Sequence, residues 1–371
     1  MFWEFGFQGE NMKNKILVAS VLVTFGFSAF AASNVTLYGS IDEGVVVGKA
    51  KHSSTTAELK SGFTAMSRFG IKGVEDLGNG YTVGFTLEQG FLADSGSEHT
   101  KGLAFSRESL LRVTGPFGTV AFGRMGALGF AQSTAILRGW AFGTSWGGSA
   151  WSVGNVHFGR LNNAVNYVTP SFNGLTVHAT YSNGTATDDN KWSDNAHYYG
   201  LGAKYTANNI DASIMFEAKD NKGLTLEDQK QKALYHITAG GTYNINGFKP
   251  GVIYQYATQS DYYHQHAFGV GMTGPLAGGS VRLGAKYVIR KYDNSYATLA
   301  DLNEKKANVW TVGAGYEYPF SKRTNLWTYG GYADGAKGWK DTSETNYNGW
   351  QVGTSEPPLR RFRSSHHSIL A

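Results

Sequence analysis

The chain has 371 residues, of which 16% are charged and 14% aromatic, with 49 glycines and no cysteine. So many aromatics argue against disorder, and so many glycines, each costing about 1 kcal/mol relative to alanine inside a helix, argue against a mainly helical protein. Arg360, Arg361 and Arg363, offset by Glu356, supply +2 of the net charge of +5. The remaining body is only modestly basic, which indicates no nucleic-acid partner. The lack of cysteine excludes disulfide and thiolate chemistry.

The N-terminal region reads as an export signal that starts at Met12. Two lysines, an apolar stretch over 16–27 and the small-residue pattern Ala29-Phe30-Ala31 follow one another, as they do in secretory signals. We predict a signal peptide over 12–31 and interpret 1–11 as a mis-assigned upstream start. No later stretch reaches the roughly 18 consecutive apolar residues of a membrane helix.

From Val35 onward, apolar and polar residues alternate with a period of two, in segments of about ten residues. The alternation is clearest over 81–88, 210–217 and 281–290. Strands of this length cross a membrane when tilted, with one face in hydrocarbon and the other in water. A soluble sandwich has the same alternation but strands of about five or six residues. The pattern therefore predicts an all-β transmembrane antiparallel barrel over 32–353.

Short turns alternate with long polar loops. The expected turns are 75–80, 115–118, 170–174, 207–209, 244–247, 274–279 and 319–323. The expected loops are 48–62, 93–103, 126–158, 183–195, 219–232, 259–263, 292–306 and 334–346. These connections join about 16 strands, an even number typical of outer-membrane barrels with short periplasmic turns.

Several motifs occur in the order and spacing of a known family. They are Asn34-Val35-Thr36-Leu37-Tyr38-Gly39-Ser40-Ile41-Asp42, Ser67-Arg68-Phe69-Gly70-Ile71-Lys72-Gly73, Glu75-Asp76-Leu77-Gly78-Asn79-Gly80, the stretch 115–124 and the stretch 160–167. With them, 34–352 resembles the general diffusion porins of Gram-negative outer membranes. The resemblance implies a homotrimer of barrels in the outer membrane, among lipid and lipopolysaccharide. It also implies that the third long loop folds inward to form a constriction, and that small hydrophilic solutes pass by diffusion.

The constriction is expected to be lined by cations. Parity places Arg68 and Lys72 on the lumen face of one strand, and the resemblance adds Arg107 and Arg160 to an arginine cluster. The third loop carries Arg138 and has Ala141 where such porins usually place a glutamate. No Asp or Glu occurs from 109 to 187. Uncompensated cations in a narrow passage raise the local anion concentration, which predicts anion preference.

Lumen acids elsewhere have the position to offset these cations. They are Asp42, Glu88, Asp211, Glu217 and Glu317. The competing interpretation is a wide, wet lumen with weak selectivity.

A few charges have the parity of lipid-facing residues, which is costly in hydrocarbon. They are Glu43, Glu108, Arg112 and Arg124. In the porins that this chain resembles, the first strands make the subunit contact. We therefore expect these charges at the oligomer interface, with Arg124 paired to an acid such as Glu98 of another subunit. The alternative is a β-bulge that changes the parity locally.

Other patterns carry little functional weight. The stretch 269–274 fits G-x-G-x-x-G but leads into Pro275 rather than a helix, and His264 and His266 lack a third metal ligand. We expect no cofactor, no metal and no catalysis. His178 on a lumen face leaves an outer-membrane hydrolase as one alternative. A secreted β-sandwich adhesin or lectin and a sugar-specific channel lined by third-loop aromatics are the others.

The C-terminal segment departs from the pattern. A final strand starts at 347, but 354–371 contains Pro357-Pro358 and is basic, unlike the aromatic-ended last strand of the porins that this chain resembles. A reading-frame change near Gly353 would produce this tail. The sequence therefore predicts a short closing strand.

Overall fold

The computed structural model describes residues 34–50, 54–62, 66–130, 156–185, 188–189, 191–222, 225–226, 229–294, 305–337 and 349–356. The expected signal peptide, the upstream segment 1–11 and the tail beyond 356 lie outside these residues. Within them the secondary structure is almost entirely antiparallel strand, with a single 3-10 turn, η1 (Trp192–Asp194). No helix in the described ranges has the length and apolar character needed to cross a membrane.

The strands divide into one large sheet and a small hairpin of β12 and β13. They are β1 (Asn34–Ser40), β2 (Glu43–Ala50), β3 (Thr56–Ser61), β4 (Arg68–Gly78), β5 (Tyr81–Gly90), β6 (Glu108–Gly115), β7 (Gly118–Gly126), β8 (Arg160–Val168), β9 (Leu175–Ser182), β10 (Tyr198–Ala207), β11 (Ile210–Lys219), β12 (Thr225–Leu226), β13 (Gln229–Lys230), β14 (Leu234–Tyr243), β15 (Lys249–Gln259), β16 (Tyr263–Leu276), β17 (Gly279–Tyr292), β18 (Lys306–Pro319), β19 (Asn325–Lys337) and β20 (Gly349–Glu356).

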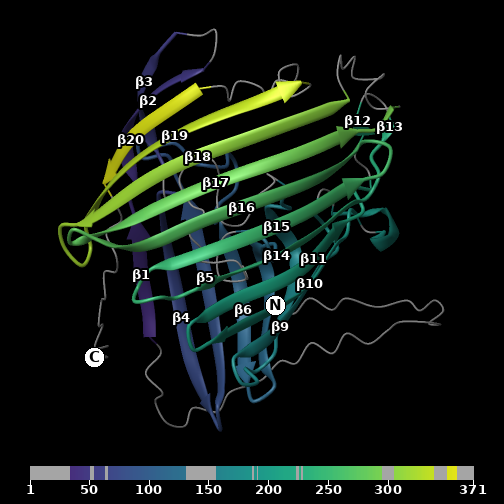
Figure 1. The fold of residues 1–371 in the computed structure, drawn as a ribbon. Helices are drawn as coiled ribbons and strands as arrows, with labels where there is room; N and C mark the ends of the chain where they lie inside the picture. Colours follow the sequence, from purple (N-terminus) through teal and green to yellow (C-terminus); the bar gives the residue numbers. More distant parts are fainter. Residues whose placement is uncertain are drawn as a thin grey trace, which may run out of the picture. The chain divides into compact units, whose positions relative to one another are not determined.

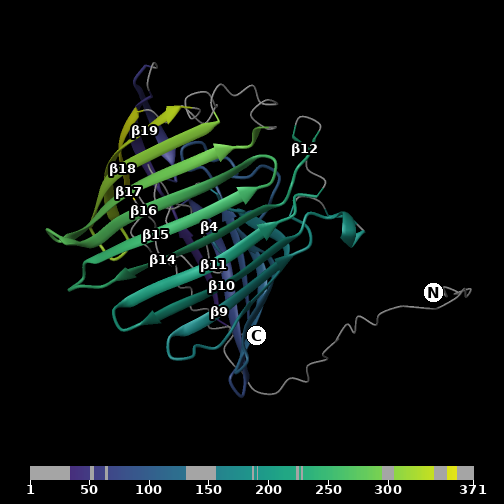
Figure 2. The same ribbon diagram turned by 45° about the vertical axis from the view of Figure 1, so that its right-hand side comes forward.

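The large sheet closes on itself. From β4 to β20 each strand of this sheet pairs with the next one along the chain, β20 pairs with β2, and β1 pairs with β4. β1 and β2 are two halves of the first span, and β3 and β4 are two halves of the second. The 18 strands of the sheet therefore make the predicted sixteen spans. In Figures 1 and 2, β14 to β18 lie side by side as tilted, neighbouring strands. This is a transmembrane β-barrel and not a two-sheet sandwich.

The two faces of the closed sheet differ in chemistry. Leu111 of β6 opposes Phe85 on one side and Phe122 on the other, and Leu111 and Phe122 are 47% and 45% exposed. The other face carries buried polar side chains such as Thr238 and Gln255. Rows of exposed apolar side chains are stable against lipid, so the polar face lines the lumen.

Glu108 and Arg112 lie on the lumen face, and the prediction that they point outward is wrong. Glu108 pairs in register with Glu88, and Arg112 pairs with Gly84, both positions of the lumen face. The prediction took the parity of Leu110 as lipid-facing. Leu110 is instead 4% exposed, inside an apolar cluster at the base of the third loop. Leu110 is thus an apolar residue on the lumen face. Alternation counted from Leu110 therefore assigns Glu108 and Arg112 to the wrong face.

The short turns lie where the sequence predicted them. Three of them place two successive residues at positive φ, Asn173-Gly174, Asn246-Gly247 and Ala277-Gly278, and the turn after β4 places three, Gly78-Asn79-Gly80. Such two-residue turns match the right-handed twist of antiparallel strands. The expected first loop over 48–62 is instead largely strand, because β2 and β3 pair there as a hairpin.

The closing pair of strands is short. β20 pairs with β2 from Gly349, opposite Ala50, to Glu356, opposite Glu43. The strand thus extends three residues past the predicted boundary at 353 and ends just before Pro357-Pro358 in the sequence. Among the described residues, no strand pairs with β1 on the side away from β4.

Replacing Pro357 and Pro358 with Thr and Tyr should strengthen the closing pair. The new residues supply backbone amides that proline lacks, and each added ladder hydrogen bond contributes about 1 kcal/mol. We expect the folded form, detected by heat-modifiable gel mobility, to persist to a temperature a few degrees higher, roughly as such an increment implies. Pro319→Thr, at the end of a strand that already has both neighbours, is the control. An unchanged unfolding temperature in the double variant would contradict the prediction.

Candidate functional site

Glu88 lies at the centre of a charged cluster on the lumen face. Its Oε1 is 2.6 Å from Nε of Arg107, and its Oε2 is 3.4 Å from Nε of Arg68. The Tyr38 hydroxyl donates a hydrogen bond to Oε2 at 2.9 Å. Glu88 is only 6% exposed, and a buried carboxylate is stable only with such partners. Glu88, which the sequence identified as a lumen acid, therefore compensates part of the predicted arginine cluster.

The strand register brings these groups together. Tyr38 pairs with Gly70, and Gly70 pairs with Glu88 on the next strand. A Cβ at position 70 would lie 2.7 Å from the Tyr38 hydroxyl and ring, so a glycine there lets the ring cross β4 to the carboxylate. The backbone amide of Arg107 donates to the Glu88 carbonyl at 3.0 Å, which positions the base of that side chain.

Lys72 and Arg160 lie beside the same cluster. Nζ of Lys72 lies 5.5 Å from the centre of the Tyr38 ring, and the guanidinium of Arg160 lies 5.2 Å from the centre of the Phe130 ring. The four cations that the sequence singled out therefore gather near two carboxylates, Glu88 and its register partner Glu108. The formal excess is two positive charges.

His99, in the second loop, lies in the positive potential of this cluster. Its backbone amide donates to the Gly90 carbonyl at 3.0 Å. Burial of the ring, together with the positive charges of Arg160 and Arg107, lowers the pKa of His99. A nearby cation disfavours a second positive charge, so His99 carries no added charge at neutral pH.

The third loop is described only at its two ends, 127–130 and 156–159. Arg138 and Ala141 lie outside the described residues, as do the loop tryptophans. At one end the Leu128 amide donates to the hydroxyl of Tyr198, a lumen-facing residue of β10. At the other end the Val156 carbonyl accepts from Gln255 of β15. Both ends thus run into the lumen, as expected for an inward-folded loop.

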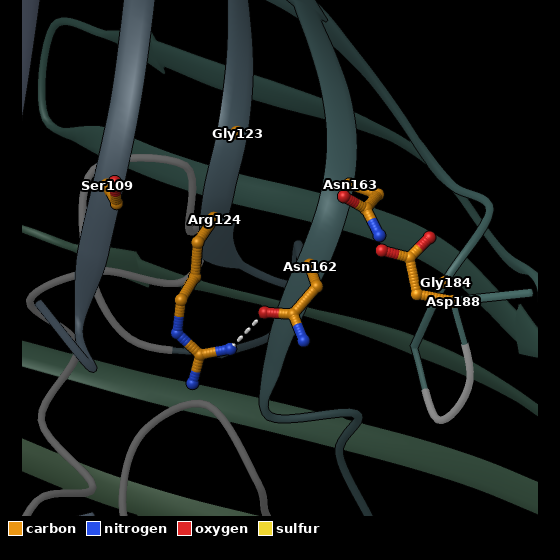
Figure 3. Close-up of a pocket in the computed structure, with 7 residues that line it drawn as sticks. All are labelled: Ser109, Gly123, Arg124, Asn162, Asn163, Gly184 and Asp188. Atoms are coloured by element: carbon orange, nitrogen blue, oxygen red, sulfur yellow. Dashed lines mark hydrogen bonds between the residues drawn. The ribbon is translucent and has the colours of Figure 1, made fainter. Parts of the chain in front are cut away.

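Arg124 lies on the outer face. It pairs in register with Ser109, in the row of exposed Phe122. Its Nε donates to the Ser106 carbonyl at 2.8 Å, and a terminal nitrogen donates to Oδ1 of Asn162 (Figure 3). The pairing of β7 with β8 shifts just beyond Gly123, but this irregularity leaves Arg124 facing outward.

A hollow of about 410 Å³ adjoins Arg124 (Figure 3). It is lined by Ser109, Gly123, Arg124, Asn162, Asn163, Gly184 and Asp188. Glu43 and Glu98 are also proposed for the oligomer interface. Strand alternation gives the side of Glu43, and Glu98 belongs to the second loop. Glu43 lies on the side of half-exposed Val45, and Glu98 is exposed, accepting a hydrogen bond from the Gly102 amide at 2.8 Å.

With this geometry in place, the comparisons with known proteins identify the family. A model described as Gram-negative porin matches residues 18–337. The chain belongs to this family. An outer membrane porin protein of Bordetella pertussis is 25% identical over 374 residues, covering 87% of this chain and 94% of that protein. Outer membrane porin protein 32 of Delftia acidovorans is 28% identical over 328 residues, covering 85% and 88%.

Solved structures share the fold of this porin. An anion-selective porin from Comamonas acidovorans superposes with a TM-score of 0.64 at 22% identity, covering 89% of this chain and 100% of that one. OmpT of Vibrio cholerae, in its trimer form, gives 0.65 at 17% identity, with 89% and 100% covered. The porin is thus an outer-membrane β-barrel, and its relatives are channels rather than enzymes.

Sequence reasoning missed two tyrosines of this porin. Tyr38 and Tyr198 each lie on the lumen face and donate to a glutamate, Glu88 and Glu217 respectively. In the sequence they look like any of the chain's many other aromatic residues, and only the register shows that each has a glutamate within reach. His178, the residue behind the hydrolase alternative, contacts the Thr176 hydroxyl at 3.1 Å on its own strand.

Glu88→Gln should raise the preference of the channel for chloride over potassium. The substitution removes one negative charge from beside four cations, and in a narrow passage we expect the permeability ratio to rise about two- to threefold. The measurement is the zero-current potential across a planar bilayer under a KCl gradient. Tyr38→Phe removes a hydrogen bond to the same carboxylate without changing charge, so its ratio should stay at the wild-type value. A ratio in Glu88→Gln at or below wild type would contradict the prediction.

Proposed function

We propose that this porin is a homotrimeric diffusion channel for small hydrophilic solutes that prefers anions. The proposed anion preference rests on the excess of cations over carboxylates at the Glu88 cluster. Arg68 and Arg107 share the one carboxylate of Glu88, while Lys72 and Arg160 add two further charges around it. Rings of Arg and Lys in a confined lumen favour anions.

Two of the other lumen acids are matched by their own cations. Asp211 lies 3.3 Å from Nζ of Lys204, and Glu317 lies 3.6 Å from Arg282. These pairs contribute little net field beyond the screening length of about 8 Å at physiological salt. The absence of Asp and Glu from 109 to 187 means that the third loop adds no negative charge. The formal charge of the Glu88 cluster is therefore positive, with four cations beside Glu88 and Glu108.

The structural neighbour from Comamonas acidovorans is described as anion-selective. At 22% identity this likeness supports the fold alone, and the proposed selectivity rests on the charges of this chain. Solute diffusion is supported by the family and by the polar lumen face. The exposed apolar outer face fits contact with outer-membrane lipid and lipopolysaccharide.

Substituting Lys72→Gln and Arg160→Gln together should bring the chloride-to-potassium permeability ratio close to one. These two side chains carry as much positive charge as the cluster has in excess over Glu88 and Glu108, so their removal leaves no formal excess. The zero-current potential in a KCl gradient at neutral pH measures the ratio. The matched control is Lys60→Gln with Lys232→Gln, two exposed lysines paired with Glu58 and Asp261. Cation preference of the wild-type channel would refute the proposal.

The proposed trimer contact uses Arg124, Glu98 and Glu43 on or near the outer face. OmpT, a structural neighbour, is described in a trimer form. A charge on the lipid-facing side of a barrel costs about 2–4 kcal/mol at mid-membrane, so shielding by another subunit explains Arg124. Glu108 and Arg112, which face the lumen, are no longer part of this contact.

Arg124→Leu should lower the temperature at which the trimer dissociates, because it removes the partner of an acid on the neighbouring subunit. Arg112→Leu is the matched control, since that arginine lies on the lumen face of the adjacent strand. Exchanging the charges, with Arg124→Glu and Glu98→Arg together, should restore part of the loss. Gel mobility after stepwise heating measures the effect, and an intact trimer in Arg124→Leu at wild-type temperatures would rule out this pairing.

A further inference from the structure

Three side chains of the barrel wall form a buried polar group opposite the ends of the third loop. The Tyr198 hydroxyl donates to Oε1 of Glu217 at 2.6 Å, and Nε2 of His236 lies 3.3 Å from Oε2 of Glu217. Tyr198 and Glu217 are 0% exposed and His236 is 2% exposed. Burying an acid and two further polar side chains inside a water-filled barrel requires something to cover them.

The strand register assembles this group as it does the Glu88 cluster. Glu217 of β11 pairs with Gly200 of β10 and with His236 of β14. A Cβ at position 200 would lie 2.5 Å from the Tyr198 hydroxyl. Glycine at this position therefore lets the Tyr198 ring fold along its own strand to reach Glu217.

The ends of the third loop cover the group from the lumen side. The Phe158 ring stacks on His236 with centroids 5.0 Å apart and meets the edge of Tyr198 at 5.4 Å. A Cβ at Gly129 would lie 2.5 Å from Oε2 of Glu217, so the backbone there lies against the carboxylate. The Tyr198 oxygen, which donates to Glu217, also accepts from the Leu128 amide at 3.2 Å.

The composition of the loop explains why the wall supplies these contacts. No Asp or Glu occurs between 109 and 187, so the loop has no carboxylate with which to pair a wall cation. Its ends are instead held through backbone groups and two aromatic rings, Phe130 beside Arg160 and Phe158 on His236. Leu128 binds Tyr198, and the Val156 carbonyl accepts from Gln255 at 3.1 Å.

We propose that Tyr198, Glu217 and His236 are positioning residues that hold both ends of the third loop against the wall and thereby set the size limit and steadiness of the passage. The inference rests on the proposed channel function. We call these three residues the anchor of the loop. Glu217 is central to it, because its carboxylate orients the Tyr198 hydroxyl toward the Leu128 amide and lies against Gly129. It acts on solute size through the loop, separately from the cations that act on charge preference.

Glu217→Ala and Tyr198→Phe test the anchor in the full-length, refolded protein. Both should raise the open-channel current noise several-fold and admit larger sugars in liposome swelling. Glu217→Gln should restore wild-type behaviour, because an amide oxygen still accepts from Tyr198. Asp211→Ala is the matched control: an acid on the same strand and the same lumen face, paired with Lys204 away from the loop ends. It should leave noise and size limit unchanged.

A second variant changes the end of the loop instead of the wall. Gly129→Val places a side chain against Glu217 without altering the wall, and it should reproduce the noise of Glu217→Ala if the barrel refolds with normal heat-modifiable mobility. Wild-type noise and size limit in both Tyr198→Phe and Gly129→Val would overturn the inference, as would equal effects of Asp211→Ala and Glu217→Ala. A wild-type protein that forms no channel would instead refute the proposed function itself.

Discussion

The closure of the sheet is the constraint on which the structure depends. In a bilayer no water is available to the backbone, so every strand edge at membrane depth must be paired, and a barrel alone meets this demand with strands. Closure in turn divides every strand into a lipid row and a lumen row, as the pairing of Phe85 with Leu111 and of Glu88 with Glu108 shows. Polar groups that would be costly in lipid are thereby collected inside, where they meet one another across neighbouring strands.

Inside the barrel, two polar groups follow one structural rule. In each, a tyrosine passes over a glycine that lies directly beside a glutamate in the strand register: Tyr38 over Gly70 to Glu88, and Tyr198 over Gly200 to Glu217. The first group holds arginines on the wall, and the second lies under the ends of the third loop. Since Glu88 is shared between two arginines, the first group keeps excess positive charge, whereas the second buries its charge almost completely.

This division separates two properties of a channel. Charge preference depends on a field, which extends over a distance comparable to the screening length and tolerates small displacements. Size limit depends on where the loop backbone lies, which changes with a displacement of an ångström or so. A loop without carboxylates can therefore lie among wall cations without neutralising them, provided that the wall itself supplies the groups that hold it.

By itself the sequence determined the barrel, the turns and the wall cations, because period-two alternation, Asn-Gly turns and the order of the motifs are local signals. It singled out Arg68, Lys72, Arg107 and Arg160, which lie around Glu88 in the structure. Only the tertiary structure decided which face Glu108 and Arg112 occupy, because Leu110 is apolar yet packs inside against the loop base. It also decided that Glu88 pairs with the arginines and that Tyr198 reaches Glu217, since those contacts depend on register between strands, which no local pattern encodes.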